Sequence, residues 1–284
     1  MKIRYPAVAG YFYELDPQSL RKQIENVFLH PLGPRRLPTV SSIRKKASIG
    51  YVSPHAGYIY SGPIAAHSYY MLAEEGKPDT IVIAGPNHTG LGVGVSVMVE
   101  GIWKTPLGDA IIDTELAKMI IKNSEYAAPD ELAHLEEHSV EVQIPFLQYL
   151  FGRVNIVPIV LMLQTPSVAK DLAEAIYEAS EKLGRDIVFI ASTDFSHYEP
   201  HEVAYKKDRL ALERILNVDP EGLYEVVNRN NISMCGPGPV MVLLYLAKIY
   251  GVTKAELLKY ATSGDVTGDR SLVVGYASVR VPLK

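Results

Sequence analysis

Three histidines follow short apolar segments, at positions where an α/β fold places functional residues. The histidines and their segments are His55 after 47–53, His88 after 80–84, and His197 after 186–191. If these segments are parallel neighbouring strands, their carboxyl ends meet at one sheet edge, where open α/β folds bind ligands. Each histidine alone is more often a loop or capping residue. Three at similar positions favour a shared site, and neutral imidazole is the commonest metal ligand.

The single cysteine lies next to a predicted helix. Cys235 belongs to the segment 233–239 (SMCGPGP), just ahead of an apolar helix predicted over 238–250. A helix N-terminus favours the thiolate, so Cys235 is a candidate metal ligand or nucleophile. The alternative is a small buried core residue, which is the usual fate of a free cysteine. Two histidines and one anionic ligand would leave positions on a metal open for substrate or dioxygen.

A competing motif occurs at His134–His138, where HLEEH matches the inverted zinc-peptidase pattern H-x-x-E-H. That chemistry requires both histidines on one helical face, with Glu137 as the base. Three fixed positions are weak evidence in a chain with eight histidines, and Pro129 makes a helix start here uncertain.

Strand and helix patterns alternate along the chain, which is typical of βαβ units with a largely parallel sheet. Strands are predicted at 47–53, 80–84, 93–99, 155–162, 186–191 and 272–281. Helices are predicted at 63–75, 114–122, 138–151, 167–184, 204–216 and 238–250. The expected fold is one three-layer α/β/α domain over 1–284, with a parallel or mixed central sheet and a surface excursion near 31–46.

Composition narrows the classes of function. The 284 residues are 48% hydrophobic and carry a formal net charge of −4, with no basic face or run that would indicate nucleic-acid binding. One cysteine excludes an intrachain disulfide and fits a reducing compartment. The N-terminal residues lack the apolar core of a signal peptide, and no apolar stretch is long enough to span a bilayer. A cytoplasmic protein without nucleic-acid or membrane partners is expected.

Six short motifs, in this order, together resemble the Memo family. They are VAGYFY (8–13), PHAGY (54–58), GPNH (85–88), EHSVE (137–141), STDFSH (192–197) and MCG (234–236), and they span nearly the whole chain. That family is similar in turn to class III extradiol dioxygenases, which hold non-haem iron with two histidines and a glutamate. The resemblance implies that His55 and His88 are metal ligands, that His197 is an acid/base, and that His138 lines the site. It also assigns Glu137 and His138 to this site rather than to a peptidase.

The chain departs from the dioxygenases at the third ligand, where Cys235 stands in place of the glutamate. A His₂Cys set is softer than His₂-carboxylate, so iron(II) or copper is expected, with zinc possible. Ring cleavage therefore does not transfer automatically. The resemblance also implies a homo-oligomer, because class III relatives often assemble into oligomers.

Three functions remain open. The first is a metal-dependent oxidoreductase in which Asp194 orients His197 and His138 also takes a catalytic part. The second is a metal-free Cys–His amidase-like hydrolase with Cys235 as nucleophile and His197 as base. The third is a module that binds a peptide or small molecule in the same cleft. Candidate ligand-binding residues are Tyr11, Phe12, Tyr58, Asn87 and Glu141.

Overall fold

A mixed β-sheet forms the centre of the computed structural model, which describes residues 2–283. Its strands are β1 (Ile3–Arg4), β2 (Ser48–Ser53), β3 (Thr80–Pro86), β4 (Val95–Val97), β5 (Ile102–Thr105), β6 (Gly108–Ile112), β7 (Ala127–Pro129), β8 (Val154–Leu161), β9 (Ile187–Ser192), β10 (His197–Glu199), β11 (Glu256–Thr262) and β12 (Val273–Pro282). The main path runs β1-β5-β6-β8-β3-β9-β2-β12-β10. Pairing is parallel from β6 through β8, β3 and β9 to β2, and antiparallel where β12 joins β2.

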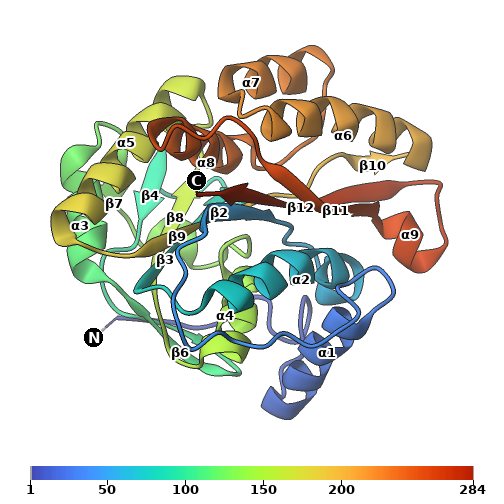
Figure 1. Cartoon of the computed structure of the whole chain (residues 1–284), viewed down its shortest axis with the longest axis horizontal. Coiled ribbons are helices and arrows are strands. Elements are labelled where there is room, and N and C mark those ends of the chain that lie inside the picture. The colour runs from blue at the N-terminus through green and yellow to red at the C-terminus, as the bar shows by residue number, and fades with distance from the viewer. Residues whose placement is uncertain (1, 284) are drawn as a thin grey trace.

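Helices cover both faces of the sheet (Figure 1). They are α1 (Pro17–Leu29), α2 (Tyr58–Glu75), α3 (Thr114–Asn123), α4 (Ile144–Phe151), α5 (Pro166–Leu183), α6 (His201–Leu216), α7 (Pro220–Arg229), α8 (Pro237–Ile249) and α9 (Ser263–Thr267). In Figure 1, α1, α2 and α4 lie below the sheet, α5 and α8 lie above it, and α3 lies at the left beside α5. This arrangement confirms the predicted α/β/α layers.

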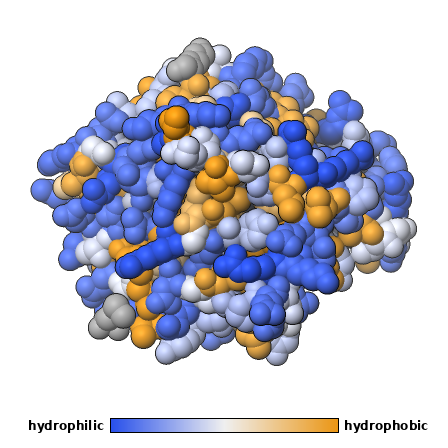
Figure 2. All heavy atoms as spheres, turned by 60° about the horizontal axis from the view of Figure 1, so that its bottom comes forward, coloured by the Kyte–Doolittle hydropathy of each residue, from blue (hydrophilic) through white to orange (hydrophobic). Residues whose placement is uncertain are grey.

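The surface in Figure 2 mixes hydrophilic and hydrophobic residues. Its hydrophobic residues form small groups among polar ones, as on most globular proteins. None of the helices within residues 2–283 is long and apolar enough to cross a membrane.

Strands β3, β9 and β2 are adjacent and parallel, and their ends are in register. Ser53 of β2 pairs with Ser192 of β9, and Ala84 of β3 pairs with Ala191. All residues of β2 and β3 are buried, which explains their continuous apolar character, because helices cover a parallel sheet on both faces. The residues that follow these three strands therefore share one edge of the sheet.

Helix α1 was absent from the elements predicted from the sequence. Asp16 caps it by accepting a hydrogen bond from the Ser19 amide at 2.8 Å, and Pro17 occupies its first turn. Its buried residues, Leu20, Ile24, Val27 and Phe28, recur at helical spacing.

The helix predicted over 138–151 begins later, at Ile144, after a short 3₁₀ turn at Glu141–Gln143. His138 therefore lies in a loop. Side chains hold this loop instead of helical hydrogen bonds: the Glu137 carboxylate accepts from the Ser139 amide at 2.8 Å, and Glu141 accepts from the N-terminal segment. Likewise α2 starts at Tyr58 rather than at the predicted residue 63, with Pro63 inside it.

Candidate metal centre

Three imidazoles and one thiol converge where β2, β3 and β9 end. The ligand atoms of His55, His88 and Cys235 lie within 4.8 Å of one another. The Nε2 atom of His55 is 3.3 Å from the Cys235 sulfur, and its ring centroid is 5.2 Å from that of His88. His138 adds a third imidazole, with its centroid 5.4 Å from that of His55. The cluster contains the residue types that bind transition metals.

His55 forms the buried side of this cluster. Its backbone amide donates to Asp194 Oδ1 at 2.8 Å, and its Nδ1 lies 2.9 Å from Ser192 Oγ. Burial, together with the nearby charges of His138 and His88, holds the pKa of His55 well below its ordinary value. The ring is therefore neutral, as a metal ligand must be.

His88 is held by a buried carboxylate. Its amide donates to Glu137 Oε2 at 2.6 Å, and its Nδ1 lies 2.9 Å from Glu137 Oε1. Burial alone would raise the pKa of Glu137, but the hydrogen bonds and charge of His88 lower it to about 2. Carboxylate–histidine pairs of this kind orient ligands in metal sites. The family resemblance places Glu137 near this site, but its contact with His88 does not follow from the sequence, because residues 49 positions apart form it.

Cys235 is a protonated thiol in the metal-free protein. Burial, and then the Asp194 carboxylate, raise the pKa of Cys235 well above its ordinary value. This shift opposes the thiolate that the α8 N-terminus would favour in the metal-free state, because desolvation acts against the helix dipole. The Asp194 amide does donate to the sulfur, at 3.2 Å. A bound cation would displace the proton, since metal binding to a thiol releases it.

His138 lies beside His88 and not on a helix. The two rings stack with centroids 4.5 Å apart and an interplanar angle of 18°, and Phe12 contacts the His138 ring at 4.8 Å. Burial lowers the pKa of His138 to about 4. The side chains of His88 and His138 are partly exposed, so solvent reaches the cluster from their side.

His197 and Asp194 do not pair as expected. The Nδ1 of His197 lies 2.7 Å from the Ser233 carbonyl oxygen, and its amide donates to Ser233 Oγ at 2.7 Å. Asp194 instead accepts from the His55 amide, and burial raises the pKa of its carboxyl. Ser233 therefore orients His197, while Asp194 fixes the backbone of a candidate ligand. His197 still acts electrostatically on His55.

The five candidate ligand-binding residues have different surroundings. Tyr11 is 88% exposed, and Phe12 contacts His138. Tyr58 is 1% exposed and donates to the Val142 carbonyl, so it belongs to the core. Asn87 folds its own loop by accepting from the amides of Thr89 and Gly90. Glu141 is fully buried and binds Arg4, Tyr13 and two amides, so it anchors the N-terminal segment on the loop that carries His138.

The peptidase interpretation is wrong. No α-helix spans His134–His138, which occupy a short 3₁₀ turn and the following loop. His134 is buried against Trp103, with ring centroids 5.7 Å apart, and it lies outside the cluster of imidazoles. Neither of its ring nitrogens makes a hydrogen bond of normal geometry with any of residues 2–283.

Replacing His134 by leucine is expected to reduce the loss of stability in acid. Burial and the Arg4 charge lower the pKa of His134 from 6.5 to about 4. Between these values the unfolded chain binds the extra proton, so stability falls as the pH falls, by up to about 1.4 kcal/mol per pH unit. Urea denaturation between these pH values measures how steeply the stability falls with pH. Part of this dependence should remain in the variant, because His55 and His138 also have lowered pKa values. An unchanged slope in the variant would contradict this assignment.

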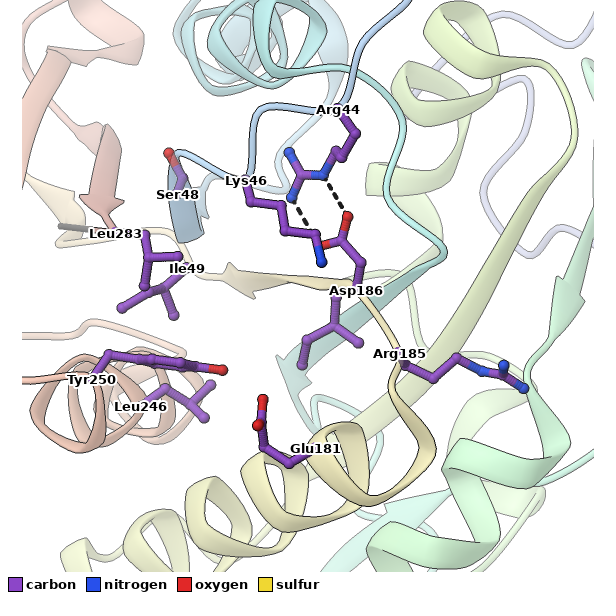
Figure 3. Close-up of a pocket in the computed structure, with 11 residues that line it drawn as sticks. Arg44, Lys46, Ser48, Ile49, Glu181, Arg185, Asp186, Leu246, Tyr250 and Leu283 are labelled. Carbon is purple, nitrogen blue, oxygen red and sulfur yellow. Dashed lines mark hydrogen bonds and ion pairs between the residues drawn. The ribbon is translucent and has the colours of Figure 1, made fainter.

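A separate cavity of about 170 Å³ lies near the amino ends of β2 and β9 (Figure 3). Figure 3 shows Arg44 pointing toward Asp186, and the two form an ion pair with Nε and Oδ2 at 2.8 Å. Arg185 turns away to pair with Asp113 and Glu115. The residues that line this cavity include no histidine or cysteine, and most of its charged side chains are already in ion pairs. The candidate site is therefore the cluster at the carboxyl edge.

Comparison with known proteins gives a consistent result. A family model described as "Memo-like protein" matches residues 4–280. A "MEMO1 family protein" of Ignicoccus hospitalis is 60% identical over 284 residues and is covered completely, as is this chain. Another from Desulfurococcus amylolyticus is 57% identical, with 99% of each chain covered. The crystal structure of an uncharacterized protein from Escherichia coli K12 shares the fold, with a TM-score of 0.53, 15% identity, and coverage of 82% of this chain and 98% of that one.

Proposed function

This chain belongs to the Memo family, and we propose that it binds iron or copper through His55, His88 and Cys235. The observation that supports this best is the convergence of three ligand atoms within 4.8 Å, each from a different chain segment. In both histidines the ring nitrogen Nδ1 has a hydrogen-bond partner: Ser192 for His55 and Glu137 for His88. Such partners are typical of metal sites, where they orient the imidazole.

The spacing of the ligand atoms suits a metal ion. Bonds of about 2.1 Å to nitrogen and 2.3 Å to sulfur would separate tetrahedral ligands by roughly 3.6 Å. The distance between His55 Nε2 and Cys235 Sγ is 3.3 Å. One thiolate with two neutral imidazoles is a soft to borderline set, which favours copper(I), zinc or a thiolate-bound iron over magnesium or calcium.

We further propose that the centre supports oxidoreductase chemistry on a small molecule or peptide. A bound iron or copper ion would supply one-electron chemistry. The partly exposed side of the cluster, beside His88 and His138, admits the ligand. His197 donates its Nδ1 hydrogen to Ser233, which leaves its Nε2 lone pair to accept a proton.

The hydrolase alternative receives less support. Its nucleophile would need a thiolate, whereas burial raises the pKa of the Cys235 thiol. The ring within reach of the sulfur is His55, at 3.3 Å, and not His197. Rapid alkylation of Cys235 in metal-free protein, with activity that survives chelation, would favour the hydrolase.

Elemental analysis of protein purified without oxygen or chelators tests the proposal. We expect close to one iron or copper per chain in the wild type and loss of that metal in Cys235→Ser. A serine hydroxyl has nearly the same shape but is a much harder and less acidic ligand. Thermal unfolding checks that the variant is folded. Wild-type protein without metal, and without uptake of added Fe(II) or Cu(I), would overturn the proposal.

A further inference from the structure

We propose that Ser192 is a positioning residue that fixes the tautomer of His55, so that Nε2 faces the metal as a bare lone pair. This inference rests on the proposed metal site and deepens it. Its evidence is a closed set of hydrogen bonds among fully buried groups: Ser192, Ser139, Gln143, Tyr69 and His55. Counting the hydrogens in this set leaves one arrangement.

The count begins at backbone carbonyls, which can only accept. Ser192 Oγ lies 2.7 Å from the carbonyl oxygen of Ser139, so the hydroxyl must donate its single hydrogen there. Any other group that contacts this oxygen must then donate to it.

Gln143 is oriented by a second carbonyl. Its amide nitrogen lies 3.0 Å from the Pro54 carbonyl oxygen, which only an N–H can satisfy. The other hydrogen of this amide points to Ser192 Oγ at 2.8 Å, because the third acceptor near this nitrogen, the Ser53 carbonyl oxygen, is farther away at 3.5 Å. On the opposite side, the amide oxygen accepts from the Tyr69 hydroxyl, which agrees with this orientation. Ser192 Oγ therefore accepts one hydrogen bond from Gln143, and its second lone pair can accept from one further donor.

His55 Nδ1, at 2.9 Å, is that donor. A neutral imidazole carries one ring hydrogen, so a hydrogen on Nδ1 leaves Nε2 without one. Nε2 is the atom that faces the Cys235 sulfur at 3.3 Å. Glu137 has the same effect on His88, since a carboxylate accepts from Nδ1. Both histidines thus turn Nε2 toward the centre. The Glu137 carboxylate fixes this tautomer in His88, and the uncharged hydrogen-bonded set of Ser192, Gln143 and Ser139 fixes it in His55.

Nitrogen NMR of the metal-free protein tests the tautomer without any metal. We expect His55 of the wild type to carry its hydrogen on Nδ1, with Nε2 unprotonated. A hydrogen on Nε2 would overturn the inference, even if the protein binds metal normally. If the wild type binds no metal, the proposed function fails, while the tautomer is still decided by this spectrum.

Ser192→Ala, with Ser68→Ala as control, tests the consequence for binding. Ser68 is also a buried serine with two hydrogen bonds, to Val52 and Ser278, but it does not contact the cluster. We expect Ser192→Ala to weaken iron(II) or copper(I) binding about 10- to 100-fold, as loss of such a partner does in other metal sites. Ser68→Ala should lose stability without this loss of affinity. Equal affinities in the two variants would overturn the role of Ser192.

Discussion

His55→Ala is expected to lose metal binding, with affinity reduced more than about 100-fold, whereas His138→Ala keeps close to one metal per chain. His55 presents Nε2 toward Cys235 and is held on the opposite side of its ring by Ser192. His138 stacks on His88 and contacts Phe12, and its ligand atom does not belong to the group formed with Cys235. Removal of His138 should therefore leave the ligand set unchanged.

Metal content after dialysis, followed by titration with iron(II) or copper(I), separates the two variants. His138→Ala is a matched control, because it removes an imidazole from the same cluster. Stoichiometric metal in His55→Ala, or equal losses in both variants, would show that the ligands are assigned incorrectly.

Arg4→Met is expected to destabilise the fold by about 3–5 kcal/mol, the usual cost of breaking a buried ion pair. Arg4 is 1% exposed and forms an ion pair with the fully buried Glu141. Its remaining donors bind the carbonyl oxygens of His134 and Glu137, at 3.0 and 2.8 Å. Methionine would fill much of the space beside Trp103, yet leave the Glu141 carboxylate and two carbonyls without these donors.

Urea denaturation measures this loss directly. Lys104→Met is the control, because it breaks a half-exposed pair with Asp109 and should cost far less. Adding Glu141→Gln to Arg4→Met should recover part of the stability by removing the unpaired charge. A loss below about 1 kcal/mol in Arg4→Met would show that the pair does not hold the N-terminal segment on the loop that carries Glu137 and His138.

Much of the fold followed from local sequence patterns. Strands β2, β3 and β9 are buried on both faces, so each appears as an apolar run, and parallel pairing brings the ends of all three to one edge. Helix α1 was missed although its signals, a capping Asp16 and Pro17, are present in the sequence. Helix α4 was placed too early because Glu137 and Glu141 hold residues 137–141 through distant partners.

The site was predictable only in its outline. The positions of His55 and His88 after parallel strands indicate a shared edge. Cys235 was a candidate from its place ahead of a predicted helix, and the family resemblance added it to the ligand set. The partners of the two histidines were not found, because Glu137 contacts His88 across 49 positions of sequence and Ser192 contacts His55 across 137. The desolvation of Cys235, which raises the pKa of its thiol, was also not predictable, since it depends on tertiary packing that a helix boundary does not reveal.

X-ray absorption at the edge of the bound metal tests the central claim most directly, because it reports the ligand atoms themselves. A centre made by His55, His88 and Cys235 predicts one sulfur at about 2.3 Å and two imidazole nitrogens at about 2.0–2.1 Å. The sulfur contribution should disappear in Cys235→Ser. A shell of oxygen and nitrogen alone in the wild type, or a sulfur signal that survives in Cys235→Ser, would contradict the assignment.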